Sequence, residues 1–245
     1  MSHLILDIGN TRSKIAVIND GVVFCVHAVD ELLPDQISYI CQQYDVSAAI
    51  ASVVGPQPDF DSLIPDNIKD LFHLLSYRSR LPISIDYDTP ETLGMDRVAA
   101  AVGARILSRS HDPLLVVDAG SCITIDLLDE YDVFRGGAIA PGLRMRFRAL
   151  NDFTAALPLV EPDDQFTLLA GSNTNDSILA GVQVATVIEI QGFADRYSST
   201  MPSLKLFLTG GDADFFANQL NFPNFANSDL LFVGLEKLLN MNINR

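Results

Sequence analysis

Two segments of the chain carry the same arrangement of an aspartate and a glycine after an apolar run. Residues 4–17 read LILDIGNTRSKIAV and residues 114–127 read LLVVDAGSCITIDL. An apolar run that ends at a tight glycine turn is typical of a buried strand entering a hairpin. Asp7 and Asp118 therefore fall at matching strand ends, where a carboxylate can hold a cation.

The turns after these aspartates are suited to phosphate. Gly9 and Gly120 carry no Cβ, so the backbone there can approach a ligand closely. Asn10 and Thr11 in the first copy, and Ser121 in the second, offer hydroxyl, amide and backbone N–H groups to phosphate oxygens. Because the two copies occur in equivalent contexts, the sequence predicts a duplicated fold with phosphate held between its halves.

A third candidate is Gly94-Met95-Asp96-Arg97. Asp96 falls at a predicted helix start, where a carboxylate is a good N-terminal cap. The alternative is a general base, because a hydroxyl that attacks phosphorus needs a group to accept its proton. Arg97 is then suited to grip a substrate carboxylate through two parallel hydrogen bonds. Lys14 likewise has two interpretations, as a phosphate contact or as an exposed strand residue.

The elements expected to position these residues repeat in order. Strands are predicted at 4–9, 13–19, 22–29, 46–54, 71–76, 114–119, 122–128, 133–139 and 204–209. Helices are predicted at 31–44, 96–108, 143–151, 175–197 and 230–240. A strand triplet followed by helices and strands, occurring twice, predicts an α/β protein of two similar domains, residues 1–111 and 112–245.

The amino-acid composition disfavours some classes of binding partner. The chain has 245 residues and a net charge of −15, which disfavours nucleic acid, because phosphate backbones bind to basic surfaces. Bound cations and backbone dipoles would have to supply positive charge at a phosphate site. P-loop and Rossmann fingerprints are absent from the sequence. Three scattered cysteines fit a reducing cytoplasm. No signal peptide and no membrane span of 18 or more apolar residues are expected.

Together these motifs resemble the ribonuclease H-like superfamily of phosphotransferases, which includes actin and the sugar kinases. They are most similar to the type III pantothenate kinases. The matching segments are DIGNT (Asp7–Thr11), GMDR (Gly94–Arg97), DAGS (Asp118–Ser121), GGAIAPG (Gly136–Gly142) and LTGGDA (Leu208–Ala213). The resemblance spans the whole chain. It implies two duplicated ribonuclease H-like, or actin-like ATPase, domains with mixed sheets and a cleft between them.

The resemblance also implies a role for each matched position. The residues implied to contact ATP are Asp7, Ile8, Gly9, Asn10, Thr11, Arg12, Ser13, Lys14 and Ser121. Those implied to contact pantothenate are Tyr87, Gly94, Met95, Asp96, Arg97 and Thr174, the last from the neighbouring subunit of a homodimer. Asp96 is the implied proton acceptor. Asp118 is the implied ligand of a monovalent cation, K⁺ or NH₄⁺, and Asp7 is expected near Mg²⁺.

The implied activity is ATP-dependent phosphorylation of pantothenate to 4′-phosphopantothenate, the first step of coenzyme A biosynthesis. Two departures from the family pattern are Ser121, where threonine is usual, and Cys122 after it; neither removes a group that the reaction needs. Two alternatives stay open, a nucleotide-binding regulatory protein without kinase activity and a kinase for another small hydroxy acid or sugar. Helix 175–197 is apolar nearly all round, which predicts either a homodimer interface or a helix internal to the second domain.

Overall fold

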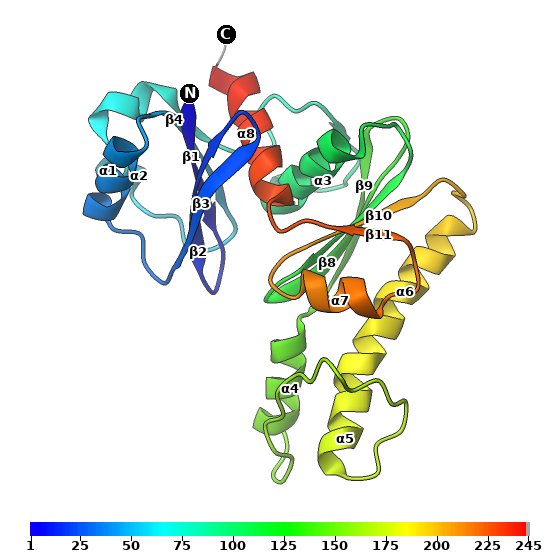
Figure 1. Ribbon diagram of the computed structural model, residues 1–245. Helices are drawn as coiled ribbons and strands as arrows, with labels where there is room; N and C mark the ends of the chain where they lie inside the picture. Colours follow the sequence, from blue (N-terminus) through cyan, green and yellow to red (C-terminus); the bar gives the residue numbers. More distant parts are fainter. Residues whose placement is uncertain (244–245) are drawn as a thin grey trace. The chain divides into compact units, whose positions relative to one another are not determined.

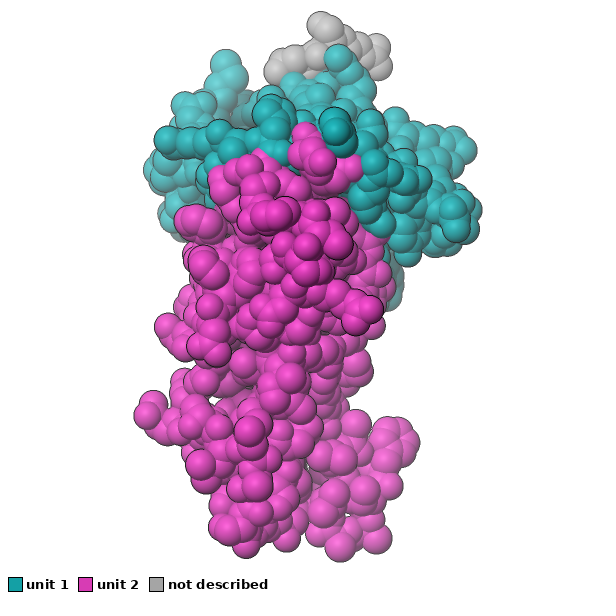
Figure 2. All heavy atoms as spheres, turned by 90° about the vertical axis from the view of Figure 1, so that its right-hand side faces the viewer, with its two compact units in different colours: residues 1–111, 131–135, 229–245 teal, residues 112–130, 136–228 magenta. Residues whose placement is uncertain are grey.

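The computed structural model describes residues 1–243, which form two compact units (Figure 2). Unit 1 comprises residues 1–111, residues 131–135 and the C-terminal segment that begins at Asp229. Unit 2 comprises residues 112–130 and 136–228. Residues 131–135 and the C-terminal segment are thus grouped with unit 1 and not with the segment that follows residue 111.

Unit 1 is built on a five-stranded mixed sheet in the order β3-β2-β1-β4-β5. Its strands are β1 (Ser2–Ile8), β2 (Ser13–Asn19), β3 (Val22–Val29), β4 (Val46–Val53) and β5 (Phe72–Leu74). Its helices include α1 (Pro34–Gln43), α2 (Phe60–Leu63), α3 (Met95–Ser108) and α8 (Leu230–Ile243), with short 3₁₀ turns η1 (Asp66–Leu71) and η2 (Pro90–Thr92). Figure 1 shows α1 and α2 on one side of this sheet and α8 on the other.

The alternation of side chains along the strands explains this layering, because successive residues point to opposite faces. Leu4, Leu6 and Ile8 of β1 belong to the core cluster that includes residues of α1. His3, on the opposite face, contacts Glu236 of α8, with 3.3 Å between His3 Nδ1 and Glu236 Oε1. Both faces of the central strand are therefore covered, and this accounts for its nearly continuous apolar sequence.

The expected β2–β3 hairpin is confirmed. Asn19 pairs with Val22, and the two residues between them, Asp20 and Gly21, have φ angles of 51° and 78°. Two consecutive positive φ angles are typical of the tight turn that matches strand twist, and an Asp-Gly pair favours it. The backbone N–H of Gly21 donates to Glu236 Oε2 at 2.8 Å, so α8 also holds the tip of this hairpin.

Unit 2 contains the same strand order. The second sheet runs β11-β10-β7-β8-β9-β6, so β9-β8-β7-β10-β11 matches β3-β2-β1-β4-β5. The strands in unit 2 are β7 (Leu114–Ala119), β8 (Cys122–Leu128), most of β9 (Val133–Pro141), β10 (Lys205–Thr209) and β11 (Asn224–Ala226), whereas β6 (Ser84–Ile85) belongs to unit 1. In both sheets the first two strands are antiparallel and the next strand pairs in parallel with the first. The predicted α/β duplication is confirmed.

The helices of unit 2 are α4 (Leu143–Asp152), α5 (Thr174–Leu179), α6 (Ala185–Ser198) and α7 (Ala213–Gln219). A π-helical segment, η3 (Ala180–Val184), joins α5 to α6, so residues 174–198 form one long helix (yellow in Figure 1). Within η3, the buried side chain of Gln183 bonds to the backbone of Asp163 and Phe166. The sequence predicted a regular α-helix here, whereas the structure contains this wider π-helical turn.

This helix meets the length and composition of a membrane-crossing helix, which the core helix of a globular protein also does. Its inward side chains, however, lie in the core of unit 2 with Ile178, Val182 and Ile190 nearly or fully buried. Only 39% of its most apolar window is buried. The excess apolar character thus comes from a core helix whose outer face remains exposed.

Two glycines allow α3 and α8 to pack backbone against backbone. A Cβ built on Gly103 of α3 would overlap the carbonyl oxygen of Leu230, and one built on Gly234 of α8 would overlap that of Ala99. No side chain fits between the helices at this crossing. The C-terminal helix therefore joins unit 1 through a contact that only glycine permits.

We expect Gly103→Ala to lower the free energy of unfolding by about 1–3 kcal/mol, because the added methyl group forces the two backbones apart. The helix-propensity gain of about 1 kcal/mol from replacing glycine does not offset a backbone clash. Urea unfolding followed by circular dichroism measures the change. Gly211→Ala is the matched control, since a Cβ there meets nothing within 4 Å. Equal stability of the two variants would refute this account of the crossing.

Candidate active site

Asp7, Lys14 and Ser52 form a polar row across the sheet of unit 1. Asp7 lies opposite Lys14 of β2 and in register with Ser52 of β4. Register partners point to the same face, so all three side chains lie on the face that α8 contacts. The Ser52 hydroxyl is fully buried and has no hydrogen-bond partner within residues 1–243. Ser52 was not predicted as a site residue. The only indication in the sequence is that it is a polar residue within an apolar strand.

The turn after Asp7 is held by its own backbone and by the end of β4. The N–H of Gly9 donates to the carbonyl of Arg12 at 3.3 Å, and the N–H of Gly55 donates to that of Ile8 at 3.3 Å. A Cβ on Gly55 would lie 2.5 Å from the Gly9 oxygen, so glycine is needed for this approach. Asn10 and its two successors are exposed, which leaves the turn's polar groups at the surface.

The GMDR segment forms the start of α3, as the sequence predicted. Gly94 is the N-terminal cap residue, and the carboxylate of Asp96 accepts the backbone N–H of Arg97 at 2.9 Å. A Cβ on Gly94 would lie 2.5 Å from Asp96 Oδ1, so this glycine makes room for the carboxylate. Burial raises the pKa of Asp96, although the Arg97 backbone N–H and charge act in the opposite direction.

Arg97 points inward and has an exposed fraction of only 6%. Its guanidinium lies 5.8 Å from the centroid of the Phe134 ring, within the range of a cation–π contact. Met95 is also buried, whereas Tyr87 is partly buried ahead of the same helix. An arginine side chain is able to bind a carboxylate through two parallel hydrogen bonds.

The two motifs of unit 1 lie near each other in the structure. The N–H of Val54, which follows β4, donates to the carbonyl of Ile8 at 2.9 Å. A Cβ on Gly94 would lie 3.6 Å from Cγ1 of the same Val54. Val54 thus contacts the end of β1 on one side and the start of α3 on the other. Widely separated sequence segments therefore bring Asp7 and Asp96 to one end of the sheet.

In unit 2, three turns converge on the end of β7. Gly210 has a φ of 93°, and a Cβ on it would lie 2.5 Å from Asp118 Oδ1. The N–H of Asp212 donates to the Ala119 carbonyl at 2.9 Å. The N–H of Gly142, the residue before α4, donates to the Ser121 carbonyl at 3.1 Å. The segments GGAIAPG and LTGGDA therefore end beside the Asp118–Ser121 turn.

Asp212 lies where these three turns meet, and no role was predicted for it from the sequence. Burial raises its pKa, and Arg144, whose Nη1 lies 3.6 Å from Asp212 Oδ1, lowers it. The strand-to-glycine turn at Thr209–Asp212 was its sequence signal, but that signal also fits an ordinary strand–helix connection. Only the packing against Ala119 reveals its proximity to Asp118.

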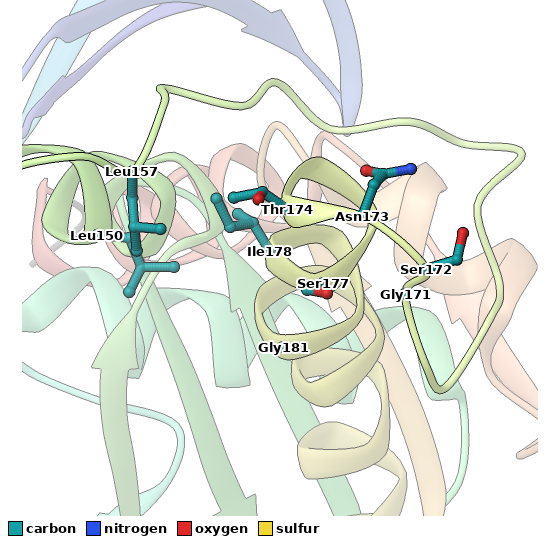
Figure 3. A pocket seen from close by; sticks show the side chains of 9 residues that line it. All are labelled: Leu150, Leu157, Gly171, Ser172, Asn173, Thr174, Ser177, Ile178 and Gly181. Carbon is teal, nitrogen blue, oxygen red and sulfur yellow. The ribbon is translucent and has the colours of Figure 1, made fainter.

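Thr174 is exposed at the first position of α5, where the side chain of Asn173 caps the helix by accepting the N–H of Asp176 at 3.0 Å. Thr174 lines a cavity of about 630 Å³. Figure 3 shows it there with Leu150 of α4 and Ile178 of α5. Asp118, Ser121 and Thr174 all belong to unit 2, whereas Tyr87 and the GMDR and DIGNT segments belong to unit 1.

Comparisons with known proteins agree with these motifs. Residues 3–196 match the family model described as type III pantothenate kinase. The chain is 37% identical to the type III pantothenate kinase of Cytophaga hutchinsonii over 241 residues, 98% of this chain and 100% of that protein. It is also 37% identical to that of Phocaeicola vulgatus, covering 98% of each.

Solved structures extend the comparison to the fold. A protein from Campylobacter jejuni, described as a conserved Baf family transcriptional activator, matches with a TM-score of 0.61 and 23% identity over 99% of this chain and 100% of that one. A glucokinase from Balamuthia mandrillaris matches with a TM-score of 0.54 and 10% identity over 98% and 93% of the two chains. These likenesses show the actin-like ATPase fold. With motifs, fold and relatives in agreement, the chain belongs to the type III pantothenate kinase family, enzymes that use ATP to phosphorylate pantothenate in coenzyme A biosynthesis.

Proposed function

We propose that this chain transfers the γ-phosphoryl group of ATP to the 4′-hydroxyl of pantothenate, with Asp96 as the proton acceptor. The observation that carries this assignment is the buried carboxylate of Asp96 beside the buried guanidinium of Arg97, within a chain of this family. The hydroxyl oxygen attacks phosphorus in line, its proton passes to Asp96, and ADP leaves. Catalysis of this kind depends on positioning and charge stabilisation.

The raised pKa of Asp96 supports its role as a base. A carboxylate with a higher pKa binds the transferred proton more strongly, and a base works best when its pKa approaches the operating pH. Because Asp96 must be ionised to act, activity falls as the pH drops through its raised pKa. The loss of activity at low pH is therefore expected at a pH above the ordinary pKa of aspartate, which is about 3.9.

We further propose that Arg97 binds the carboxylate of pantothenate, with Tyr87, Gly94 and Met95 lining the same pocket. Pantothenate carries one carboxylate at the end opposite its 4′-hydroxyl. A buried arginine offers the planar donor pair that fits this group.

For ATP, we propose that the Asp7–Lys14 segment and Ser121 contact the phosphates. A Mg²⁺ ion would be held by Asp7 together with the phosphates, and it would neutralise charge that develops on them. A single carboxylate such as Asp7 fits this arrangement, because Mg²⁺ is commonly held by one or two carboxylates together with substrate phosphate oxygens. Asp118, whose carboxylate lies against Gly210, fits a monovalent cation, K⁺ or NH₄⁺.

A homodimer that completes the pantothenate site is part of this proposal. Exposed positions on the outer face of the long helix are small or apolar at helical spacing; they are Gly181, Ala185, Ile188 and Gly192. The two glycines have open space where a Cβ would point, and Ile188 has an exposed fraction of 55%. Such a face accepts a second helix at close range, and two-fold dimers are the commonest assembly. We also propose a cytoplasmic location, with neither nucleic acid nor membrane as partner.

We expect Asp96→Asn to reduce kcat by at least about 100-fold, because an amide cannot accept the proton. The assay is ADP release with and without pantothenate, and against other small alcohols, which tests the substrate in the same series. ATP binding and stability should persist, since removing a buried carboxylate of raised pKa also removes its desolvation cost.

Asp88→Asn, which changes an exposed carboxylate of the preceding segment, is the matched control and should retain full activity. Wild-type turnover in Asp96→Asn would remove Asp96 from the mechanism. ADP release that does not depend on pantothenate would instead favour another acceptor.

We expect Asp118→Asn to abolish most of the advantage of K⁺ or NH₄⁺ over Na⁺, while the dependence on Mg²⁺ is kept. The chain has a net charge of −15, so bound cations must offset the charge of the triphosphate. Initial rates in potassium, ammonium and sodium salts at equal ionic strength measure the effect. Asp164→Asn, an exposed carboxylate of unit 2, is the control. If wild-type rates are equal in all three salts, the monovalent site is wrong.

We expect Ile188→Asp to yield a monomer by light scattering with little pantothenate-dependent activity, because a charge is placed in the proposed interface. Thr174→Ala should raise KM for pantothenate about 3- to 10-fold, as expected for a lost hydrogen bond, and leave KM for ATP nearly unchanged. A mixed dimer of Thr174→Ala and Asp96→Asn subunits should regain one working site of its two. A fully active monomeric wild type would contradict the dimer.

A further inference from the structure

Lys14 lies over an aromatic ring and forms no ion pair within residues 1–243, although Asp7 lies opposite it on β1. Its Nζ lies 5.9 Å from the centroid of the Phe232 ring, and no carboxylate within residues 1–243 forms an ion pair with it. Other basic side chains do have such partners, including Arg12 with Asp30 and Lys205 with Asp112. In a protein with 31 acidic and 16 basic residues, Lys14 instead places a partly buried ammonium near an aromatic face.

The Phe232 ring is itself held in place. Phe232 belongs to α8 and has an exposed fraction of 2%. One turn further along α8, Glu236 contacts His3 and accepts the N–H of Gly21. Between them, Gly234 packs against the backbone of α3. The helix is therefore fixed to both the sheet and α3, and the ring offers a rigid surface to the ammonium.

A ring and a carboxylate have different consequences for a lysine that must bind phosphate. A carboxylate would orient the ammonium but cancel its charge and compete with the phosphate. The face of a phenyl ring attracts the ammonium through its quadrupole and carries no net charge. Since a free lysine side chain loses rotamer entropy when it binds an anion, holding the side chain beforehand reduces that loss.

We propose that Phe232 is a positioning residue that holds the Lys14 ammonium ready for the phosphates of ATP without neutralising it. This inference rests on the proposed function, in which the Asp7–Lys14 segment contacts those phosphates. It links the C-terminal helix, which carries none of the family motifs, to nucleotide binding. The competing explanation is that Phe232 only fills the core between α8 and the sheet.

The experiment is a double-mutant cycle on Phe232 and Lys14, read by calorimetric binding of MgATP and of adenosine. Phe232→Leu should weaken MgATP binding about 3- to 10-fold, the range of a partly buried cation–π contact. Adenosine has no phosphates, so its affinity should not change. In a Lys14→Met background, Phe232→Leu should have no further effect on MgATP, because the cation is already gone. Phe232→Tyr, which retains the ring, should bind MgATP as the wild type does.

Phe216→Leu is the matched control, because Phe216 is a fully buried phenylalanine of unit 2. It should leave both affinities unchanged. If Phe232→Leu does not fold, Phe232→Met replaces it, since methionine is similar in volume and has no ring. An unchanged MgATP affinity in the Phe232 variant overturns the proposal, as does an equal loss for adenosine or in the Lys14→Met background. A wild type that does not bind MgATP overturns the proposed function itself.

Discussion

The close approach of α3 and α8 is the constraint on which the candidate site of unit 1 depends. Because Gly103 and Gly234 carry no side chains, the two helix backbones touch, and α8 is fixed against the sheet. The same α3 carries Asp96 and Arg97 at its first turn, and the same α8 places Phe232 beside Lys14. One backbone contact thus helps to position the proposed base Asp96, the guanidinium proposed to bind the substrate carboxylate, and the Lys14 ammonium. A core this closely packed transmits small changes in volume to the site.

Unit 2 uses glycine in a comparable way. Gly210 combines a positive φ with a position against the Asp118 carboxylate, and Gly142 lies against the Gly120–Ser121 backbone. Three turns from distant parts of the sequence therefore meet where β7 ends. Converging turns of this kind are able to present backbone dipoles to an ion without basic side chains. We proposed above that cations bound here offset the charge of the triphosphate, since the chain itself carries a net charge of −15.

The buried ionisable groups differ in what surrounds them, and this difference separates catalytic from structural candidates. Arg105 pairs with Asp132 at 2.6 Å and Glu236 contacts His3, so these charges stabilise local structure. Asp96, in contrast, is buried with its pKa raised, and no cationic side chain outweighs that desolvation. A carboxylate kept in such a costly environment is a candidate for proton transfer.

The sequence by itself determined the element order, the duplication and the position of the motifs, because apolar periodicity and glycine turns are local properties. Asp7, Asp96 and Asp118 were identified in this way, and their roles remain proposals. Tertiary structure alone decided that α8 belongs with the first unit, that Phe232 lies beside Lys14, and that the buried Ser52 lies next to Asp7. It also decided the π-helical turn at Ala180–Val184. Gln183 lies in this turn, and its side chain donates a hydrogen bond to the backbone of a distant loop. These features depend on contacts between residues far apart in the chain, and no local pattern encodes which distant backbone a glycine or an aromatic ring will meet.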